Sequence, residues 1–179
     1  ENLVSDSTAL TERIVPTGIR FEDRDIAVSV TPVGVDVDFV TESAGKPETA
    51  RRAAEIRDGL EDTKLILSVG RTDYTKGGTE QLASFERLLE TEPDLKGKVR
   101  LMHVSVSANR NMTVYENVQN EIEQIAGRVN GAHGGLHRMP VHYIYASLPR
   151  EDLVAYYRAA DVMCVTPLAD GMNLVAKEF

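Results

Sequence analysis

The feature that most constrains the fold is a regular alternation of short apolar runs and amphipathic segments from residue 64 onward. Four runs predict buried parallel strands because they lack a polar face: KLILSVG (64–70), VRLMHVSV (99–106), VHYIYA (141–146) and DVMCVTP (161–167). Apolar residues then recur at helical spacing, which predicts helices over residues 79–93, 112–129, 147–160 and 171–179, with Thr79 and Ser147 as candidate N-caps. This strand–helix order predicts an α/β fold, a Rossmann-like parallel sheet with helices on both faces, with ligands at the carboxyl ends of the strands.

The pattern before residue 64 is weaker. The run IAVSVTPVGVD (26–36) predicts a strand with a loop before it, and residues 48–59 predict a helix. We therefore expect residues 1–30 to end a preceding domain or to act as a linker, and residues 31–179 to form the Rossmann-like domain. The chain starts without methionine and stops at Phe179 inside a helical pattern, so we expect a fragment truncated at its C-terminus.

Composition and charge exclude several classes of function. The chain has 20 basic and 28 acidic residues and a formal net charge of −8, which argues against sequence-independent binding of nucleic acid. No run approaches the roughly 18 apolar residues of a membrane span, and no export signal is evident. We therefore expect a soluble, cytoplasmic protein without a membrane partner. The sequence leaves the oligomeric state open, including a homo-oligomer.

Cysteine and histidine residues give no sign of a metal centre. The single cysteine, Cys164, lies among apolar residues and is predicted to be a buried small hydrophobe. The four histidines, His103, His133, His137 and His142, have no partner at metal-ligand spacing, so no protein-held metal is expected. His133 and His137 are expected in a glycine-rich loop.

Polar residues follow two of the predicted strands. Arg71 and Lys76 lie in the loop RTDYTKGG, where a guanidinium and an ammonium could bind phosphate oxygens and where Gly77 and Gly78 permit tight turns. A solvent-exposed basic loop is the other interpretation of this pattern.

The second loop, TPLADG, precedes the last predicted helix. Free N–H groups at a helix start near Gly171 could bind a pyrophosphate, and Glu178 could accept hydrogen bonds from ribose hydroxyls. The alternative is that Asp170 only caps this helix.

Five segments, in order and spacing, resemble the trehalose-6-phosphate synthase family of retaining glycosyltransferases. They are SVGRTDYTKG, SFERLLE, YENVQNEIEQIAGRVNG, SLPREDLVAYYRAADV and VTPLADGMNLVAKEF. The resemblance covers about residues 30–179 and implies the donor-binding domain of a two-domain GT-B enzyme. It further implies a nucleoside diphosphate glucose (ADP-, UDP- or GDP-glucose) as co-substrate, small-molecule partners and no tightly bound cofactor. Mg²⁺ is not expected as a protein-held ion.

The resemblance also implies roles for individual residues. Arg71 and Lys76 would bind the donor diphosphate, Asp170 the glucosyl hydroxyls, and Glu178 the ribose, and the first three are the expected catalytic residues. The backbone of the stretch between them would contact sugar and phosphates: Gly171, Met172, Asn173, Leu174 and Val175. No side-chain nucleophile is evident, which agrees with the front-face substitution proposed for the family.

Departures from the family pattern bear on the acceptor. Members that use glucose 6-phosphate usually carry an arginine where this chain has Asn109, with Arg110 beside it, and these two residues are the expected acceptor contacts. The segments SVGRTDYTKGG and NMTVYENVQNEIE resemble the related glucosylglycerol-phosphate synthases more closely. We therefore expect glycerol 3-phosphate as acceptor, with trehalose-6-phosphate synthesis or a non-catalytic regulatory module as alternatives. Ala169 replaces a common arginine and is expected to affect donor affinity or the choice of nucleobase rather than the type of reaction.

Overall fold

The computed structural model describes residues 13–15, 18–21, 23–29, 31–107, 113–136 and 138–179. Contacts divide the chain into two compact units, Glu1–Gly34 and Val35–Phe179. In the first unit an antiparallel sheet has the order β1 (Arg13–Val15), β2 (Gly18–Phe21), β3 (Arg24–Ala27). The loop predicted before residue 26 is therefore wrong, and the strand predicted for 26–36 ends at Ala27.

The second unit contains a four-stranded parallel sheet. Its strands are β4 (Lys64–Arg71), β5 (Val99–Val106), β6 (Val141–Tyr145) and β7 (Val162–Met163). They lie in the order β6-β5-β4-β7, and every neighbouring pair is parallel. The chain therefore runs outward from β4 to β6 and then crosses back to place β7 on the other side of β4.

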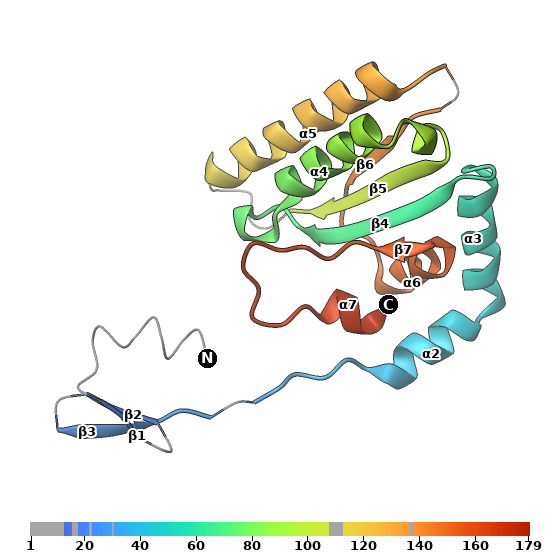
Figure 1. Cartoon of the computed structure of the whole chain (residues 1–179). Helices are drawn as coiled ribbons and strands as arrows, with labels where there is room; N and C mark the ends of the chain where they lie inside the picture. Colours follow the sequence, from blue (N-terminus) through green and yellow to red (C-terminus); the bar gives the residue numbers. More distant parts are fainter. Residues whose placement is uncertain (1–12, 16–17, 22, 30, 108–112, 137) are drawn as a thin grey trace. The chain divides into compact units, whose positions relative to one another are not determined.

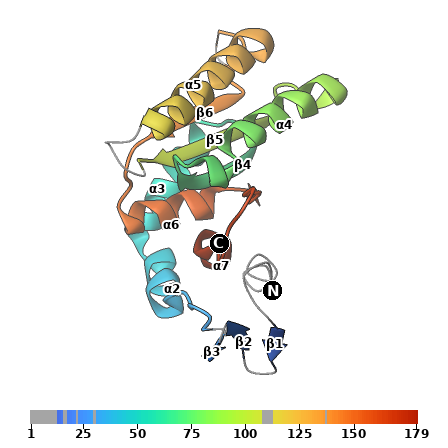
Figure 2. The same ribbon diagram turned by 90° about the vertical axis from the view of Figure 1, so that its left-hand side faces the viewer.

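Helices cover both faces of this sheet (Figures 1 and 2). Helices α4 (Gly78–Thr91) and α5 (Thr113–His133) pack on one face, and α3 (Pro47–Asp58) and α6 (Arg150–Ala159) on the other. The α/β class predicted from the sequence is confirmed.

Alternation along the strands divides the core in two. Leu65 and Leu67 of β4 are fully buried and belong to the cluster that includes α3 and α6. Leu101 of β5 belongs to the cluster that includes α4 and α5. Because successive side chains point to opposite faces, a strand covered on both sides must be apolar almost throughout. This explains why the sequence predicted β4 and β5 so closely.

Several helix boundaries differ from the prediction. Helix α2 (Val37–Gly45) was not predicted, and the Asp36 carboxylate caps it by accepting a hydrogen bond from Phe39 N–H. Helix α5 extends to His133 rather than residue 129, and near its end the Asn130 amide donates to the Val141 carbonyl and accepts from the Val141 N–H. Helix α6 begins at Arg150, so Ser147 does not cap it.

The segment after α6 also differs from the prediction. Strand β7 covers only two of the seven residues predicted as strand, and the last helix, α7, is Leu174–Glu178 rather than 171–179. Two short 3₁₀ turns, η2 (Tyr74–Lys76) and η3 (Pro93–Leu95), complete the second unit.

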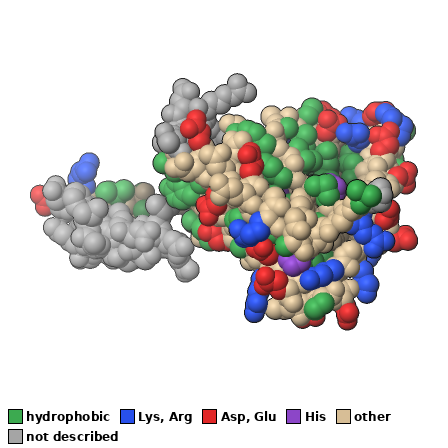
Figure 3. Space-filling view, turned by 90° about the horizontal axis from the view of Figure 1, so that it is seen from above, with side chains coloured by type: hydrophobic (Ala, Val, Ile, Leu, Met, Phe, Trp, Pro, Cys, Tyr) green, Lys and Arg blue, Asp and Glu red, His purple; other side chains and the backbone are tan. Residues whose placement is uncertain are grey.

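Charged side chains of both signs are interspersed on the face shown in Figure 3. Within the described ranges, no helix combines the length and apolar character that a bilayer span requires. The same ranges contain no group of three or more His, Cys, Asp or Glu side chains placed to hold a metal ion.

Candidate functional site

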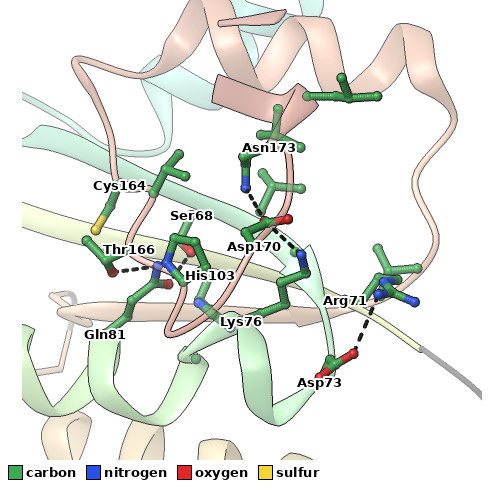
Figure 4. Close-up of a pocket in the computed structure, with 18 of the residues that line it drawn as sticks. Ser68, Arg71, Asp73, Lys76, Gln81, His103, Cys164, Thr166, Asp170 and Asn173 are labelled. Carbon is green, nitrogen blue, oxygen red and sulfur yellow. Dashed lines mark hydrogen bonds and ion pairs between the residues drawn. The ribbon is translucent and has the colours of Figure 1, made fainter. Parts of the chain in front are cut away.

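A pocket of about 360 Å³ lies at the carboxyl ends of the parallel strands (Figure 4). Its walls include the segment after β4 and the segment after β7. These two strands are neighbours, although the chain leaves β4 toward β5 and reaches β7 only after crossing the sheet. In open α/β sheets, ligands bind where strand order reverses in this way.

The pocket brings together most of the predicted site residues. Those that line it are Arg71, Lys76, Asp170, Met172, Asn173, Leu174 and Val175. They come from two segments that are far apart in the sequence, so the prediction that two strand-to-helix loops share one site agrees with the fold.

Lys76 and Asp170 form an ion pair at the pocket, with Nζ 2.7 Å from Oδ2. The Asp170 carboxylate also accepts hydrogen bonds from the Asn173 amide (3.1 Å) and from Met172 N–H (3.4 Å). The bond from Lys76, aided by those from Asn173 and Met172, lowers the pKa of Asp170 below its ordinary value although burial opposes the shift. An ammonium has three N–H donors, so Lys76 can hold Asp170 and a second acceptor together.

Arg71 lies at the rim, and its side chain is 60% exposed. Its Nη2 is 3.5 Å from Asp73 Oδ2, a loose contact that leaves most guanidinium donors available. Burial would raise the pKa of Asp73, but hydrogen bonds from the Thr75 N–H and hydroxyl outweigh it, and the pKa lies below its ordinary value. Asp73 therefore stays ionised and organises the turn between Arg71 and Lys76.

Gly77 brings the two pocket segments close together. Its φ of +66° lies in the left-handed region, and a Cβ there would lie 2.9 Å from the Thr166 carbonyl oxygen. Gly77 is also the residue that precedes α4, so the cap predicted at Thr79 is wrong. Leu168 N–H and Ala169 N–H both donate to the Thr75 carbonyl oxygen, at 2.9 and 3.1 Å. Glycine at this position is required for the segment carrying Asp170 to pack on η2.

The inner wall contains polar residues that the sequence analysis missed. Ser68, Gln81 and Thr166 are joined by hydrogen bonds, and His103 lies beside them. Burial lowers the pKa of His103 to about 4, which keeps the imidazole neutral near pH 7. A polar residue inside an otherwise apolar strand is a signal that could have identified Ser68 and His103.

Glu178 and Gly171 do not line this pocket. The Glu178 carboxylate accepts hydrogen bonds from Arg150 (3.1 Å) and from the Tyr157 hydroxyl (3.0 Å), and thus connects α7 to α6. Burial, followed by the Glu178 charge, raises the pKa of Tyr157, which keeps this hydroxyl a donor. The ribose role of Glu178 remains a prediction.

The start of the last helix also requires correction. Asn173, not Asp170, caps α7 by accepting a hydrogen bond from Ala176 N–H. The helix therefore begins three residues later than predicted, and Asp170 forms an ion pair with Lys76 instead. The interpretation of Asp170 as a simple helix cap is wrong.

The remaining residues named from the sequence lie outside the described residues, in the pocket wall or at a helix end. Asn109, Arg110 and His137 lie outside the described residues, so the structure gives no account of them. Cys164 is half-buried and lines the pocket, so the prediction that it is a buried small hydrophobe is wrong. His133 ends α5 rather than lying in a loop.

Comparison with known proteins adds independent information. The model of glycosyltransferase family 20 matches residues 2–179. A glucosylglycerol-phosphate synthase of Synechocystis sp. is 41% identical over 96% of this chain and 34% of its own length. An alpha,alpha-trehalose-phosphate synthase of Dictyostelium discoideum is 37% identical over 92% of this chain and 22% of its own length. The chain thus spans about a fifth to a third of these relatives.

Solved structures agree with these matches. An alpha,alpha-trehalose-phosphate synthase (UDP-forming) from Burkholderia xenovorans, in complex with glucose-6-phosphate, superposes with a TM-score of 0.83 and 37% identity. The match covers 89% of this chain and 35% of that one. An E. coli structure described as trehalose-6-phosphate bound with UDP-2-fluoro glucose gives a TM-score of 0.82 and 33% identity, over 98% and 38% of the two chains.

Proposed function

The chain belongs to glycosyltransferase family 20, and we propose that in its full-length form the protein moves glucose from a nucleoside diphosphate glucose to a phosphorylated acceptor, with retention at the anomeric carbon. Residues 31–179 would supply the donor-binding domain of a two-domain GT-B enzyme. UDP-forming relatives and a solved relative bound to UDP-2-fluoro glucose support a nucleotide-sugar donor.

The observation that carries this proposal is the geometry around Lys76. Its ammonium lies 2.7 Å from Asp170 Oδ2 in the wall of a pocket at the carboxyl edge of the sheet. The Arg71 guanidinium lies at the rim of this pocket. A diphosphate needs cations, and hexose hydroxyls are well bound by a carboxylate with fixed orientation. Both groups are available within one pocket of about 360 Å³.

These residues would act mainly through electrostatics. Negative charge builds up on the leaving diphosphate as the glucosyl bond breaks, and cations held in place beforehand stabilise it without rearranging. Arg71 and Lys76 would supply this charge. Asp170, kept ionised by Lys76, would orient the glucosyl group.

Two acceptors remain in the proposal. The sequence motifs favour glycerol 3-phosphate, while the match to a synthase solved with glucose-6-phosphate supports the alternative of trehalose-6-phosphate synthesis. The cytoplasmic location remains a prediction from the sequence, and the sequence leaves the nucleobase of the donor and the oligomeric state open.

The test is a turnover assay of the full-length protein with glycerol 3-phosphate and glucose 6-phosphate in parallel, each with UDP-, ADP- and GDP-glucose. We expect release of the nucleoside diphosphate and a glucosylated product with one acceptor. Absence of product with all six pairs, despite nucleotide binding, would favour the regulatory module. Absence of nucleotide binding would overturn the donor-domain assignment.

Matched lysine variants test the site itself. Lys76→Ala removes the pocket ammonium, and we expect donor affinity to fall by about 10-fold or more, as for other charge-assisted contacts. Lys64→Ala is the control, because Lys64 also pairs with an aspartate, Asp161, but at the opposite edge of the sheet. Equal effects of the two variants would contradict the assignment of Lys76.

A further inference from the structure

Gln81 joins three separate parts of the second unit through its side-chain amide. Its Oε1 accepts a hydrogen bond from the Ser68 hydroxyl of β4 at 2.5 Å, and its Nε2 donates to the Thr166 hydroxyl at 2.9 Å (Figure 4). Gln81 itself lies in the first turn of α4 and is 8% exposed. Both ends of the amide are therefore used in a largely buried bridge between β4, α4 and the segment after β7.

Thr166 is a point of attachment for the segment that carries Asp170. Two residues further on, Leu168 N–H donates to the Thr75 carbonyl oxygen, and Ala169 N–H does the same. The chain is thus held at Thr166 by a side chain and at 168–169 by backbone bonds, directly before Asp170 reaches Lys76. Strand β7 ends at Met163, so regular pairing does not hold this segment.

The two attachments differ in what they demand of the sequence. A bond from N–H to the Thr75 carbonyl oxygen can be made by nearly any residue, because it uses only the backbone. The bridge through Gln81 requires an amide of this length, an acceptor for Ser68 and a donor for Thr166. Removing the amide would leave two hydroxyls without their partner in a mostly buried place, which favours a shift of the segment.

We propose that Gln81 is a positioning residue for the donor site, which acts on Asp170 through Thr166. The proposal rests on the proposed function, in which Asp170 meets the glucosyl group and the cations meet the diphosphate. A displaced Asp170 would then weaken binding of the nucleotide sugar more than binding of the nucleotide alone.

The experiment compares the dissociation constants of UDP-glucose and UDP for the full-length protein by calorimetric titration. The corresponding ADP or GDP pair is used if turnover selects it. Gln81→Met keeps the volume and removes the amide. We expect it to raise the dissociation constant of UDP-glucose by about tenfold, as small misplacements in active sites do, and that of UDP by less than about threefold.

Thr166 provides a matched pair that separates the hydrogen bond from packing. Thr166→Val keeps the shape and removes the hydroxyl, so it should reproduce the selective loss of affinity. Thr166→Ser keeps the hydroxyl and should restore the ratio of the two dissociation constants to within about twofold of the unaltered protein. The double variant Gln81→Met/Thr166→Val should be no worse than Gln81→Met alone, since Gln81→Met already removes the bond to Thr166.

The outcomes distinguish failure of the proposed function from failure of the role of Gln81. If the unaltered protein binds no nucleoside diphosphate and no nucleoside diphosphate glucose, the proposed function and the role of Gln81 both fail. If it binds them and the ratio is unchanged in Gln81→Met and Thr166→Val, only the role of Gln81 fails. A fall in melting temperature with an unchanged ratio would show that the bridge serves stability alone and would likewise overturn the proposal.

Discussion

Two aspartates flank strand β7, and they use the same chemistry for different ends. Asp161, before the strand, accepts hydrogen bonds from Leu65 N–H (2.8 Å), Lys64 (2.9 Å) and Arg57 (2.7 Å). Asp170, after the strand, accepts from a lysine, an amide and a backbone N–H. Each aspartate is therefore an ionised carboxylate with a lysine, a second side chain and a backbone N–H as partners.

The difference lies in which edge of the sheet each aspartate occupies. Asp161 joins the amino ends of β4 and β7, and its bond from Leu65 N–H, then that from Lys64, lowers its pKa to about 2. Asp170 faces a pocket at the carboxyl edge together with a cation that can bind a further acceptor. An ion pair alone thus says little about function, and its place in a parallel sheet says much more.

The largest effect that would test this contrast is expected at Asp170. Asp170→Asn removes the negative charge but keeps an acceptor, and we expect kcat/KM to fall by about 10²- to 10³-fold, as for other preorganised polar contacts. The melting temperature should change by no more than about 2 °C. Initial rates and thermal unfolding measure both quantities.

The matched variant Asp161→Asn should lower the melting temperature and leave the activity of the folded protein within about threefold of the unaltered protein. The contrast between the two edges is lost if Asp170→Asn lowers stability while activity persists.

As the pH falls, stability should be lost through His103 of the pocket wall before it is lost through Asp161 at the amino edge. Burial lowers the pKa of His103 from 6.5 to about 4, so between these values the unfolded chain holds more protons than the folded one. The contribution of His103 to the free energy of unfolding is therefore complete above pH 6.5 and should be lost as the pH drops toward 4, on the order of 3 kcal/mol. Burial also lowers the pKa of His142, which adds a decline in the same direction. Asp161 contributes stability above pH 3.8, and this is lost only as the pH falls toward 2.

Denaturant unfolding at several pH values between 7 and 4 tests this order, and His103→Gln is the informative variant. It lacks the titrating imidazole, so its free energy of unfolding should vary less with pH across this window. An equally steep decline in His103→Gln would show that another group is responsible.

The smallest effects are expected at the amino edge. Asp161→Ala leaves Leu65 N–H without its acceptor and should lower the free energy of unfolding by about 1–3 kcal/mol. Lys64→Ala removes only a lysine that is 68% exposed, and should cost no more than about 1 kcal/mol. Urea unfolding of the two variants measures both values. A larger loss of unfolding free energy in Lys64→Ala would show that the lysine stabilises this edge more than the Leu65 N–H contact does.

The sequence predicted the buried part of the fold well, because strands covered on both faces cannot carry polar residues freely. β5 was predicted at its observed bounds and β4 to within one residue. Strands β1 and β2 were missed and β3 was predicted only at Ile26 and Ala27, since these strands are short and carry charged residues such as Arg20 and Asp25 that break any apolar pattern. Helix α2 was missed because valines and a phenylalanine there resemble a strand.

The candidate site was predicted in part. Arg71, Lys76 and Asp170 were found because charged residues after two predicted strands must meet at one edge of a parallel sheet. Gln81 was not found, because helical spacing identifies a face but not the partner of a buried amide. The backbone around Asp170 was misjudged because its carboxylate bonds to Lys76, a contact between residues 94 positions apart.

That separation has a consequence for the order in which the protein is made. A ribosome completes β4, β5 and β6 before it reaches the segment of β7, so the nascent domain holds Lys76 without its carboxylate partner. Closing so long a loop is slow compared with forming local contacts, which places assembly of the pocket among the last folding events. A ligand that binds only the completed pocket then stabilises the finished fold by mass action.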